Sequence, residues 1–280
     1  MNETTQEKNR YLGEILTKMG RVMVAFSGGV DSTLVLKRAQ QELGDQVLAV
    51  VVGSELFRQE EFEAAVKLAE DMGVQVYQTE MKELENLAIV ENTPNSWYES
   101  KKMLYSHLNH LAVELDYPYV LDGMIMDDLE DFRPGMQART EAGVRSVLQE
   151  AGLFKHEVRE LAKQLALPVW NKPASCSLAS RIPYGSKLTK QKINQIDQAE
   201  KFLASLGFAQ TRVRHHDNVA RIEVTPEEIT ELVKYRDQIQ MKLTSLGFTY
   251  VSLDLRGYRT GSMNEELPSS LLDSASAVSI

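Results

Sequence analysis

The sequence predicts an α/β protein in which a doubly wound, mainly parallel sheet is followed by a smaller α+β domain. Three observations predict this fold class. Short apolar runs alternate with amphipathic stretches through the first half of the chain, a glycine-rich turn follows the first run of strand length, and prolines interrupt the pattern after Gly152. At ~100–200 residues per domain, the 280 residues of the chain are enough for two domains.

The first domain, residues 1–166, is expected to contain a Rossmann-like sheet whose strands are joined by helices. Apolar runs of strand length define its strands, at residues 21–26, 46–52, 74–79 and 119–123. Stretches of helical periodicity define its helices, at residues 32–43, 60–72, 99–115 and 155–166. Gly44 and Gly73 follow two of these helices, where a glycine commonly ends a helix.

The second half of the chain is expected to form a linking loop and a small α+β domain. Prolines at positions 168, 173 and 183 interrupt residues 167–188, which predicts the loop. The domain at residues 189–260 is expected to consist of a helix at 189–206, strands at 211–216, 220–224 and 250–255, and a helix opened by a capping box of Thr225 and Glu228 around Pro226. Residues 261–280 are poor in bulky side chains and are expected to be a disordered tail.

Composition narrows the class of function. A formal net charge of -9 and a pI near 5.2 oppose non-specific binding to nucleic acid, because that binding depends on basic groups that displace counterions. No apolar run approaches the ~20 residues of a membrane span, and the polar N-terminus does not resemble a signal peptide. The single cysteine, Cys176, excludes an intramolecular disulfide and a cysteine cage for a metal cluster. We therefore expect a cytoplasmic protein without nucleic acid or membrane partners.

The strongest motif follows the first predicted strand directly and consists of Ser27, Gly28, Gly29, Val30, Asp31 and Ser32. Glycines let the backbone curl around phosphate oxygens, while backbone amides and a helix N-terminus supply positive potential. The two serines can add hydroxyl donors. The alternative is an ordinary strand-to-helix turn capped by Asp31 or Ser32, which needs a glycine but not the whole hexapeptide. The motif is not a Walker loop, because it has no Gly-Lys-Ser or Gly-Lys-Thr ending.

A second motif, at residues 123–135, reads G-M-I-M-D-D-L-E-D-F-R-P-G and follows the fourth predicted strand. Like charges this close are costly unless a cation or a basic group compensates them. Asp127 and Asp128 are therefore candidate ligands of magnesium or of a nucleotide, and Arg133 is a candidate phosphate contact. A solvated acidic loop is the alternative.

Cys176 lies between two serines in a loop bounded by prolines, and Lys172 and Arg181 are near it in the sequence. Positive charges nearby favour the thiolate, which is the reactive form of cysteine. A lone cysteine is also commonly a small buried apolar residue without chemistry. The residues alone leave both interpretations open.

In the second predicted domain, Arg212, Arg214 and His216 alternate along a strand and so share one face. Three basic groups on one face can bind a phosphate, and arginine can do so through two parallel hydrogen bonds. An exposed strand face without ligand is the alternative. Glu200 and Glu223 are candidates for a proton-abstracting base or a metal ligand near the same face.

A family resemblance covers roughly residues 10–260. The hexapeptide resembles the S-G-G-x-D-S signature of PP-loop enzymes, which split ATP between its α- and β-phosphates and hold the pyrophosphate in this loop. The narrower resemblance is to the LarE family of sulfur insertases, which act in the synthesis of the lactate racemase cofactor. It rests on residues 123–135, on C-S-L-A-S-R-I-P-Y-G at 176–185 and on R-V-R-H-H-D-N-V-A-R-I-E-V at 212–224.

The resemblance implies a PP-loop fold, the use of ATP and Mg²⁺, and a set of site residues. Asp31 and Asp128 are expected to hold the metal. Cys176, Glu200 and Arg181 are expected to be catalytic. The residues expected to contact the nucleotide are Ala25, Ser27, Gly28, Gly29, Val30, Asp31, Ser32, Val52, Gly53, Gly123, Met126 and Arg133. The residues expected to contact the second substrate are Trp97, Ser180, Arg181, Arg212, Arg214 and Glu223.

The resemblance also implies the chemistry. The substrate would be a pyridinium dicarboxylate mononucleotide whose carboxylate is adenylated, after which Cys176 displaces AMP and gives up its sulfur, leaving dehydroalanine. Trp97 could stack on the pyridinium ring or simply pack against its neighbours. The family resemblance further implies a homo-oligomer that passes its product to a nickel-inserting enzyme. Related enzymes more often have G-T-N-x-D-D where this chain has G-M-I-M-D-D, so Met124 and Ile125 depart from the pattern.

Two other classes of function stay open at this point. One is a different PP-loop reaction, either tRNA thiolation or ATP-driven amidation. The acidic charge argues against tRNA, and no cysteine beyond Cys176 exists for a glutaminase centre. The other class is a nucleotide sensor without turnover.

Overall fold

The computed structural model describes residues 4–130, 135–173, 175–259, 262 and 265. These residues form two compact units. The first unit contains the described parts of Met1–Lys82 and Trp97–Ser175, and the second contains those of Glu83–Ser96 and Cys176–Pro268. Apart from Ser262 and Glu265, the tail predicted at 261–280 lies outside the described residues.

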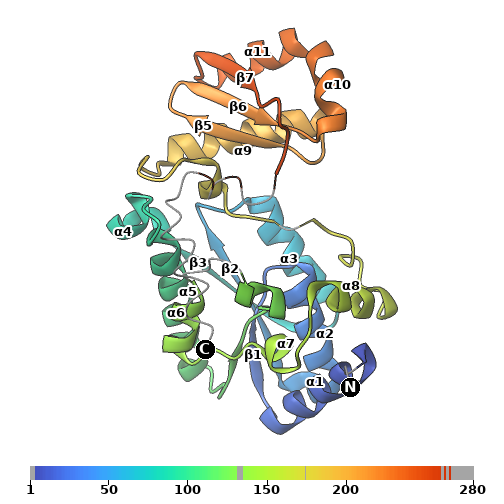
Figure 1. Cartoon of the computed structure of the whole chain (residues 1–280). Coiled ribbons are helices and arrows are strands. Elements are labelled where there is room, and N and C mark those ends of the chain that lie inside the picture. Colours follow the sequence, from blue (N-terminus) through green and yellow to red (C-terminus); the bar gives the residue numbers. More distant parts are fainter. Residues whose placement is uncertain (1–3, 131–134, 174, 260–261, 263–264, 266–280) are drawn as a thin grey trace. The chain divides into compact units, whose positions relative to one another are not determined.

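A four-stranded parallel sheet forms the centre of the first unit (Figure 1). Its strands are β1 (Val22–Ala25), β2 (Val47–Ser54), β3 (Gln75–Met81) and β4 (Val120–Leu121), in the order β3-β2-β1-β4. Val24 in β1 pairs with Ala49 on one side and with Leu121 on the other. Because the first strand is central and the chain winds outward in both directions, the predicted doubly wound sheet is confirmed.

Helices cover both faces of this sheet (Figure 1). One core contains Leu34 of α2 and Leu161 of α8, and the other contains Tyr105 and Leu108 of α5. The helices on the first face are α1 (Thr5–Met19), α2 (Val30–Leu43), α3 (Gln59–Asp71), α7 (Val147–Glu150) and α8 (Lys155–Gln164). Those on the second face are α5 (Ser96–Glu114) and α6 (Gly135–Ala142).

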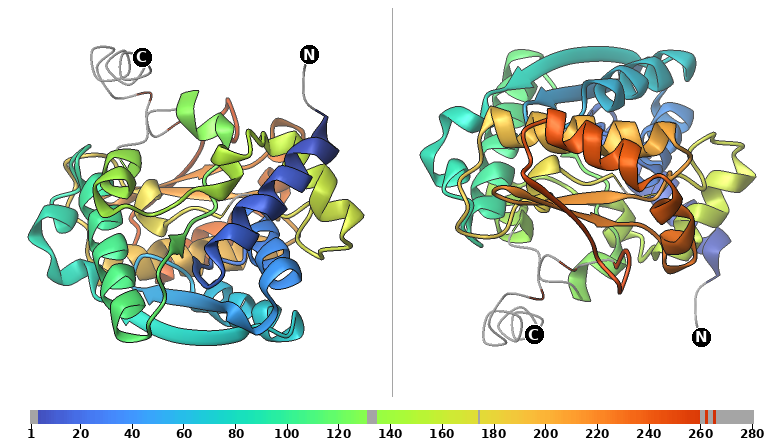
Figure 2. Two further views of the ribbon diagram at one scale, coloured as in Figure 1. Left: turned by 90° about the horizontal axis from the view of Figure 1, so that it is seen from below. Right: turned by 90° about the horizontal axis from the view of Figure 1, so that it is seen from above.

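The second unit is an α+β layer of one three-stranded sheet and the helices packed on it (Figure 2). Strand β6 (Val219–Glu223) lies in the middle, antiparallel to β5 (Arg212–His216) and parallel to β7 (Tyr250–Leu253). Apolar side chains of α9 (Lys190–Ser205), α10 (Ile229–Lys234) and α11 (Arg236–Ser245) cover one face of the sheet. The other face carries the alternating basic residues.

Several elements differ from the prediction. The capping box of Thr225 and Glu228 is present, but it opens a short 3-10 turn, η5 (Pro226–Glu228), before α10 and α11. The helix predicted at 99–115 begins earlier, at Ser96, so Trp97 lies in the first turn of α5. Ser96 accepts from the Thr93 amide and donates to the Ala88 carbonyl at this helix start. The predicted loop at 167–188 contains η4 (Leu178–Arg181). Three short helices, α4 (Leu87–Val90), α6 and α7, were not predicted.

Residues Glu83–Ser96 belong to the second unit although they come from the first half of the sequence. Hydrogen bonds of Asn92 connect this segment to the second unit. Its side-chain amide donates to the carbonyls of Ile182 at 3.2 Å, Pro183 at 2.9 Å and Ser186 at 3.1 Å. Asn92 is buried and has a left-handed backbone with φ of 50°, a conformation that asparagine tolerates better than most residues.

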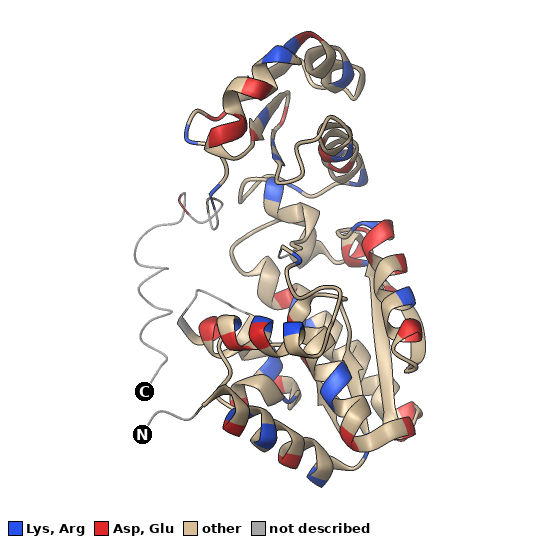
Figure 3. Ribbon diagram, turned by 90° about the vertical axis from the view of Figure 1, so that its right-hand side faces the viewer, with Lys and Arg blue, Asp and Glu red and all other residues tan. Residues whose placement is uncertain are grey.

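Charges of both signs are mixed along the exposed helices (Figure 3). In α1 and α2, for example, Arg38 pairs with Glu42, and Arg10 lies near Glu14. Within the part of the chain that the structure describes, no helix combines the length and the apolar character that crossing a bilayer requires.

Candidate active site

The turn between β1 and α2 is a cradle of backbone groups. Gly28 has φ of +68°, and a Cβ on it would lie 3.0 Å from Cβ and 3.1 Å from Cα of Ala65 in α3. Gly29 is the extended N-cap of α2, so the first amides of this 14-residue helix point toward the turn. The backbone and the close contact with α3 therefore require a glycine at position 28, and the cradle offers amides and a helix dipole to an anion.

Hydroxyl groups hold the cradle in shape. Ser32 Oγ accepts from the Ser27 amide at 3.3 Å, lies 3.0 Å from Ser27 Oγ and donates to the Gly29 carbonyl at 3.2 Å. The Gly29 amide donates to Ser27 Oγ at 3.3 Å. Thr33 Oγ1 also donates to the Gly29 carbonyl, at 2.7 Å. The two predicted serines are thus brought together, and they order the loop from within.

Asp31 lies in the first turn of α2 with its two oxygens in different surroundings. Oδ2 accepts from Lys155 Nζ at 2.6 Å. Oδ1 is buried and has no hydrogen-bond partner among the described residues. A buried carboxylate oxygen without a partner is costly, and a cation would remove that cost. Asp31 therefore fits the role of a magnesium ligand.

Two lysines that the sequence analysis did not assign to the cradle lie beside it. Lys155 is the first residue of α8, and its own amide donates to Asp127 Oδ2 at 2.8 Å. Lys172 Nζ donates to the Gly28 carbonyl at 3.4 Å. Both ammonium groups would be attracted to phosphate charge in the cradle.

The chain after β4 borders the cradle closely. A Cβ on Gly123 would lie 2.8 Å from the Ser32 amide nitrogen, so only glycine fits there. Asp122 is buried, and its Oδ1 accepts from the Met124 amide at 3.1 Å and from Ser146 Oγ at 2.6 Å. Its Oδ2 accepts from the Tyr105 hydroxyl at 2.9 Å. This buried network shapes the turn that the predicted nucleotide residue Gly123 belongs to.

Other predicted nucleotide residues lie at the carboxyl ends of the strands. Ala25 is the last residue of β1, and Val52 and Gly53 are near the end of β2, opposite Thr79 and Glu80 of β3. The carboxyl edge of a parallel sheet is where ligands of doubly wound folds bind. Met126 begins η3 (Met126–Glu130), and its amide already donates to the Leu153 carbonyl at 3.0 Å. Arg133 lies outside the described residues.

In the second unit, Arg181 holds the backbone around Cys176. Arg181 Nη1 donates to the Cys176 carbonyl at 3.2 Å and to the Ser177 carbonyl at 2.9 Å, while the Cys176 residue is exposed. The same group donates to Ser180 Oγ at 2.8 Å. Nε and Nη2 donate to the two oxygens of Glu200 at 3.0 and 3.2 Å, and both side chains are 3% exposed. The Arg181–Glu200 pair is therefore a buried, bidentate support for the cysteine loop, the predicted loop at 167–188 that contains Cys176.

The polar face of the second sheet carries a further set of ion pairs. Arg214 Nη2 donates to Glu223 Oε2 at 2.8 Å, and Arg221 Nη1 lies 3.1 Å from Glu223 Oε1. Arg214 Nη1 also donates to the Ser180 carbonyl at 2.9 Å. Ser180, Arg214, His216 and Arg221 line one cleft in this unit. The predicted alternation is confirmed, since His215 on the opposite face is buried against Phe248.

Arg212 lies on the same strand face with its guanidinium 5.2 Å from the ring of Tyr258. Burial, and next the charge of Arg181, lower the pKa of Arg212 below its ordinary value. A third contribution from Glu200 acts in the opposite direction. A phosphate would relieve the repulsion between the two arginines.

Comparison with known proteins decides the family. The pyridinium-3,5-bisthiocarboxylic acid mononucleotide synthase of Lactiplantibacillus plantarum is 52% identical over 265 residues, which are 94% of this chain and 96% of that protein. The chain belongs to the LarE family of these synthases. An uncharacterised protein of Synechocystis is 40% identical over 264 residues, 94% of this chain and 98% of that protein.

More distant similarity places the LarE family among other PP-loop proteins. The family model described as NAD synthase matches residues 5–104, a range that includes the cradle. A component of the glutamine-hydrolysing GMP synthase of Sulfurisphaera tokodaii is 27% identical over 210 residues, 68% of this chain and 57% of that protein. The match to the NAD synthase model thus covers the part of the chain that contains the glycine cradle.

The predicted metal ligands of this LarE chain do not lie in a carboxylate cluster. Asp128 is buried, and its Oδ2 accepts from the Ile125 amide at 2.8 Å. Among the described residues, no group of three or more histidine, cysteine, aspartate or glutamate side chains is placed to hold a metal ion. Asp31 Oδ1 is therefore the oxygen at the cradle whose surroundings fit a cation, and phosphate oxygens would supply further ligands.

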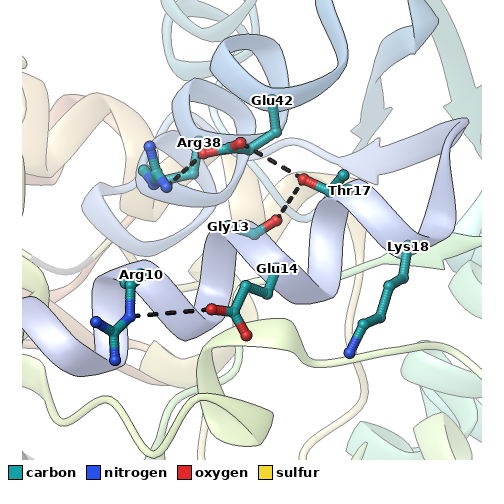
Figure 4. A pocket seen from close by; sticks show the side chains of 7 residues that line it. All are labelled: Arg10, Gly13, Glu14, Thr17, Lys18, Arg38 and Glu42. Carbon is teal, nitrogen blue, oxygen red and sulfur yellow. Dashed lines mark hydrogen bonds and ion pairs between the residues drawn. The ribbon is translucent and has the colours of Figure 1, made fainter.

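A surface depression of the first unit lies apart from this site. It lies between α1 and α2, where Gly13 allows Arg38 and Glu42 to approach the helix (Figure 4). Arg38 Nη2 donates to Glu42 Oε1 at 2.6 Å, and Thr17 Oγ1 donates to the Gly13 carbonyl at 2.8 Å. None of the predicted site residues of the LarE chain lines the depression.

Sequence reasoning missed residues whose importance depends on long-range contacts. Lys155 is 124 positions from Asp31, and nothing in the local pattern indicates the pair. Arg221 had a usable signal, because it alternates with Glu223 along a predicted strand and so shares its face. Tyr105 and Ser146 gave none, since each comes from a different predicted segment.

Proposed function

We propose that the protein is an ATP-dependent sulfurtransferase that uses Cys176 as the sulfur donor. Its substrate is a pyridinium dicarboxylate mononucleotide, and its product is the corresponding thiocarboxylate. The full-length similarity to the synthase of L. plantarum carries this proposal. The exposed cysteine in a loop supported by buried charges, and the glycine cradle, support it independently.

The first half of the reaction is adenylation. A carboxylate oxygen of the substrate attacks the α-phosphorus of ATP, the bond between this phosphorus and the bridging oxygen breaks, and pyrophosphate leaves. The amides after Gly28 and the N-terminus of α2 hold the leaving pyrophosphate. Lys155 and Lys172 add positive charge where negative charge accumulates. Ala25, Val52 and Gly53 line the edge of the sheet where the adenosine binds.

Magnesium would neutralise phosphate charge during this step. Asp31 Oδ1 is the oxygen of this chain that fits the ion, because it is buried and has no hydrogen-bond partner among the described residues. Lys155 would then exchange its ion pair with Asp31 for a phosphate oxygen. Asp128 stays a second proposed ligand of the ion.

The second half is sulfur transfer. The Cys176 thiolate attacks the acyl carbon and expels AMP, which gives a thioester. A base then removes the Cα proton of Cys176, the C–H electron pair forms the Cα–Cβ double bond, and the Cβ–S pair stays on sulfur. The substrate leaves as a thiocarboxylate and the protein retains dehydroalanine. Glu200 is the proposed base, and protonating it would require a rearrangement of its pair with Arg181.

The second unit is proposed to bind the substrate mononucleotide. Its phosphate would contact Arg212, Arg214 and Ser180. The ion pair with Glu223 holds Arg214 in place. The buried Nε of Arg214 has no hydrogen-bond acceptor among the described residues, which supports an anionic partner. Trp97 is proposed to stack on the pyridinium ring. We also propose a homo-oligomer and a product that passes to a nickel-inserting enzyme.

Incubation of the protein with ATP, magnesium and the dicarboxylate mononucleotide tests the proposal. We expect AMP and pyrophosphate, a thiocarboxylate product, and an intact protein mass reduced by the elements of hydrogen sulfide, mapped to position 176. Cys176→Ser is expected to release pyrophosphate and transfer no sulfur. Formation of ADP, or an unchanged mass after turnover, would contradict the proposal.

The similarity to a GMP synthase favours one second candidate, an ATP-driven amidation. The same incubation with ammonia distinguishes the two functions. An amide product with Cys176 intact would support amidation, because ammonia and not the cysteine would then attack the adenylate.

A further inference from the structure

The chain that leads into Cys176 is fastened to the first unit. Arg159 of α8 donates to the Trp170 carbonyl at 3.2 Å and to the Lys172 carbonyl at 3.4 Å. Lys172 in turn donates to the carbonyl of Gly28 at 3.4 Å. The segment before Cys176 is therefore hydrogen-bonded both to α8 and to the cradle.

The last of these attachments is next to the cysteine. Ser175 Oγ donates to Glu61 Oε2 at 2.5 Å. Glu61 is a half-buried residue in the first turn of α3, and a hydroxyl bonded to a carboxylate is a charge-assisted hydrogen bond. Such a bond fixes the direction of the Ser175 side chain more firmly than a bond between neutral groups.

Helix α3 connects this attachment to the cradle. Glu61 and Ala65 are four residues apart, so they lie on one face of the helix, about 6 Å apart along its axis. Ala65 is 2% exposed and is the residue that a Cβ on Gly28 would touch. One helix face thus supports the cradle with Ala65 and holds Ser175 with Glu61.

The boundary between the two units lies at the peptide bond between Ser175 and Cys176. Ser175 is the last residue of its segment in the first unit, and Cys176 is the first residue of the next segment in the second. Arg181, itself held by Glu200, binds the Cys176 carbonyl. Because consecutive Cα atoms are ~3.8 Å apart, the Glu61–Ser175 bond keeps Cys176 within one peptide of a fixed point in the first unit.

We propose that Glu61 is a positioning residue for sulfur transfer, acting through Ser175. Its carboxylate holds Ser175 beside the cradle, so that the thiolate of Cys176 is delivered to the acyl-adenylate. Adenylation needs no contribution from the Glu61–Ser175 bond, because that step involves only ATP and the substrate carboxylate. The inference rests on the proposed function and adds a residue that acts in its second half only.

The test separates the two halves of the reaction in Glu61→Ala, Ser175→Ala and the double variant. Pyrophosphate release measures adenylation, and loss of the elements of hydrogen sulfide from the intact mass measures sulfur transfer in a single turnover. We expect pyrophosphate release within about twofold of wild type and sulfur transfer slowed about 10- to 100-fold, as for other small misplacements of reacting groups. The double variant is expected to be no slower than either single variant, since both remove one bond.

Two variants serve as controls. Glu63→Ala removes another carboxylate of α3, one that accepts from Gln59, and is expected to change neither rate. Ser175→Thr keeps a hydroxyl and is expected to restore most of the sulfur transfer. If Glu61→Ala does not fold, Ser175→Ala still tests the bond, because it alters only an exposed residue.

Sulfur transfer at the wild-type rate in Ser175→Ala, or additive losses in the double variant, would overturn the inference and leave the proposed function standing. A wild-type protein that releases no pyrophosphate would instead overturn the proposed function, and the inference with it. Equal losses of both rates in Glu61→Ala would also overturn the inference, because they indicate a structural role for the residue.

Discussion

At the scale of single residues, Gly28 has a backbone conformation and a neighbour that together exclude a side chain. We expect Gly28→Ala to reduce the free energy of unfolding by about 2–3 kcal/mol, since a left-handed alanine costs ~1–2 kcal/mol and the contact with Ala65 adds overpacking. Pyrophosphate release is expected to fall at least about tenfold, because the cradle must open. Urea unfolding and a pyrophosphate assay measure the two effects.

Gly20 provides the matched control. It has φ of +72° in the same unit, but a Cβ on it would meet no atom within 4 Å. Gly20→Ala is therefore expected to cost about 1 kcal/mol through the backbone alone and to leave pyrophosphate release unchanged. Equal losses of activity in the two variants would show that the contact with Ala65 has no special role.

His215 makes stability depend on pH. Burial, and then the charge of Lys192, lower the pKa of this histidine below its ordinary value. Below about pH 6.5 the unfolded chain takes up a proton at His215 that the folded chain does not. The contribution of His215 is thus fully present above about pH 6.5 and is lost as the pH falls from there toward the folded-state pKa.

Urea unfolding between pH 5 and pH 8 measures this dependence. We expect His215→Gln to be less stable at pH 8 and to have a flatter pH profile, whereas His156→Gln, at an exposed position, keeps the wild-type profile. His107 is expected to retain part of the slope, because burial lowers its pKa as well. An unchanged slope in His215→Gln would contradict the assignment.

Residues of the cradle could be predicted because their local sequence determines their geometry. A glycine after a strand and before a helix indicates a tight turn, and serines and an aspartate beside it indicate phosphate and cation chemistry. The partners of these residues could not be predicted in the same way. The Lys155–Asp31 pair and the Glu61–Ser175 bond join positions more than 100 residues apart, and only the folded chain brings them together.

At the scale of elements, the buried carboxylate of Asp122 connects β4 to α5 and to the start of α7. Burial and the charge of Asp122 raise the pKa of Tyr105 far above its ordinary value, so its hydroxyl donates at every physiological pH. We expect Tyr105→Phe to reduce the free energy of unfolding by about 1–3 kcal/mol, because it leaves a buried carboxylate oxygen without a donor. Thermal or urea unfolding measures the loss.

Tyr98 in the same helix is the control for Tyr105. Its hydroxyl donates to the exposed carboxylate of Glu141 at 2.6 Å, where water can replace it. Tyr98→Phe is expected to change stability by less than about 0.5 kcal/mol. If the two substitutions cost the same, the Asp122 network is not a special support of the turn at Gly123.

Long elements with strong periodicity were predicted within a few residues of their observed bounds. Helix α9 was predicted at 189–206 and runs from Lys190 to Ser205. The short helices α4 and α7 have four residues each, too few to display a period, although their apolar residues Ile89 and Val147 are buried. Glu83–Ser96 also belongs to the second unit through long-range contacts, since the Asn92 amide donates to carbonyls 90, 91 and 94 positions away.

At the scale of the whole molecule, binding in the cradle is expected to stabilise the fold. An ATP analogue that cannot be cleaved between its α- and β-phosphates, added with magnesium at about 100 times its Kd, is expected to stabilise the native state by about 2.7 kcal/mol. Removing magnesium with a chelator is expected to reduce the shift, because Asp31 Oδ1 loses its cation. Differential scanning calorimetry measures the change, and Asp31→Asn is expected to abolish its magnesium dependence.

The route of the chain through Asn92 has a practical consequence. The second unit is assembled from two stretches of sequence, with residues Trp97–Ser175 inserted between them. Expressing the C-terminal half alone would omit the asparagine that cross-links three carbonyls of the cysteine loop, so a truncated fragment would lack part of its own framework. A protease that cuts the chain just before Cys176 would separate the second unit into two pieces. The N-terminal piece would still contain Glu83–Ser96, and the hydrogen bonds of Asn92 would still hold it to the C-terminal piece.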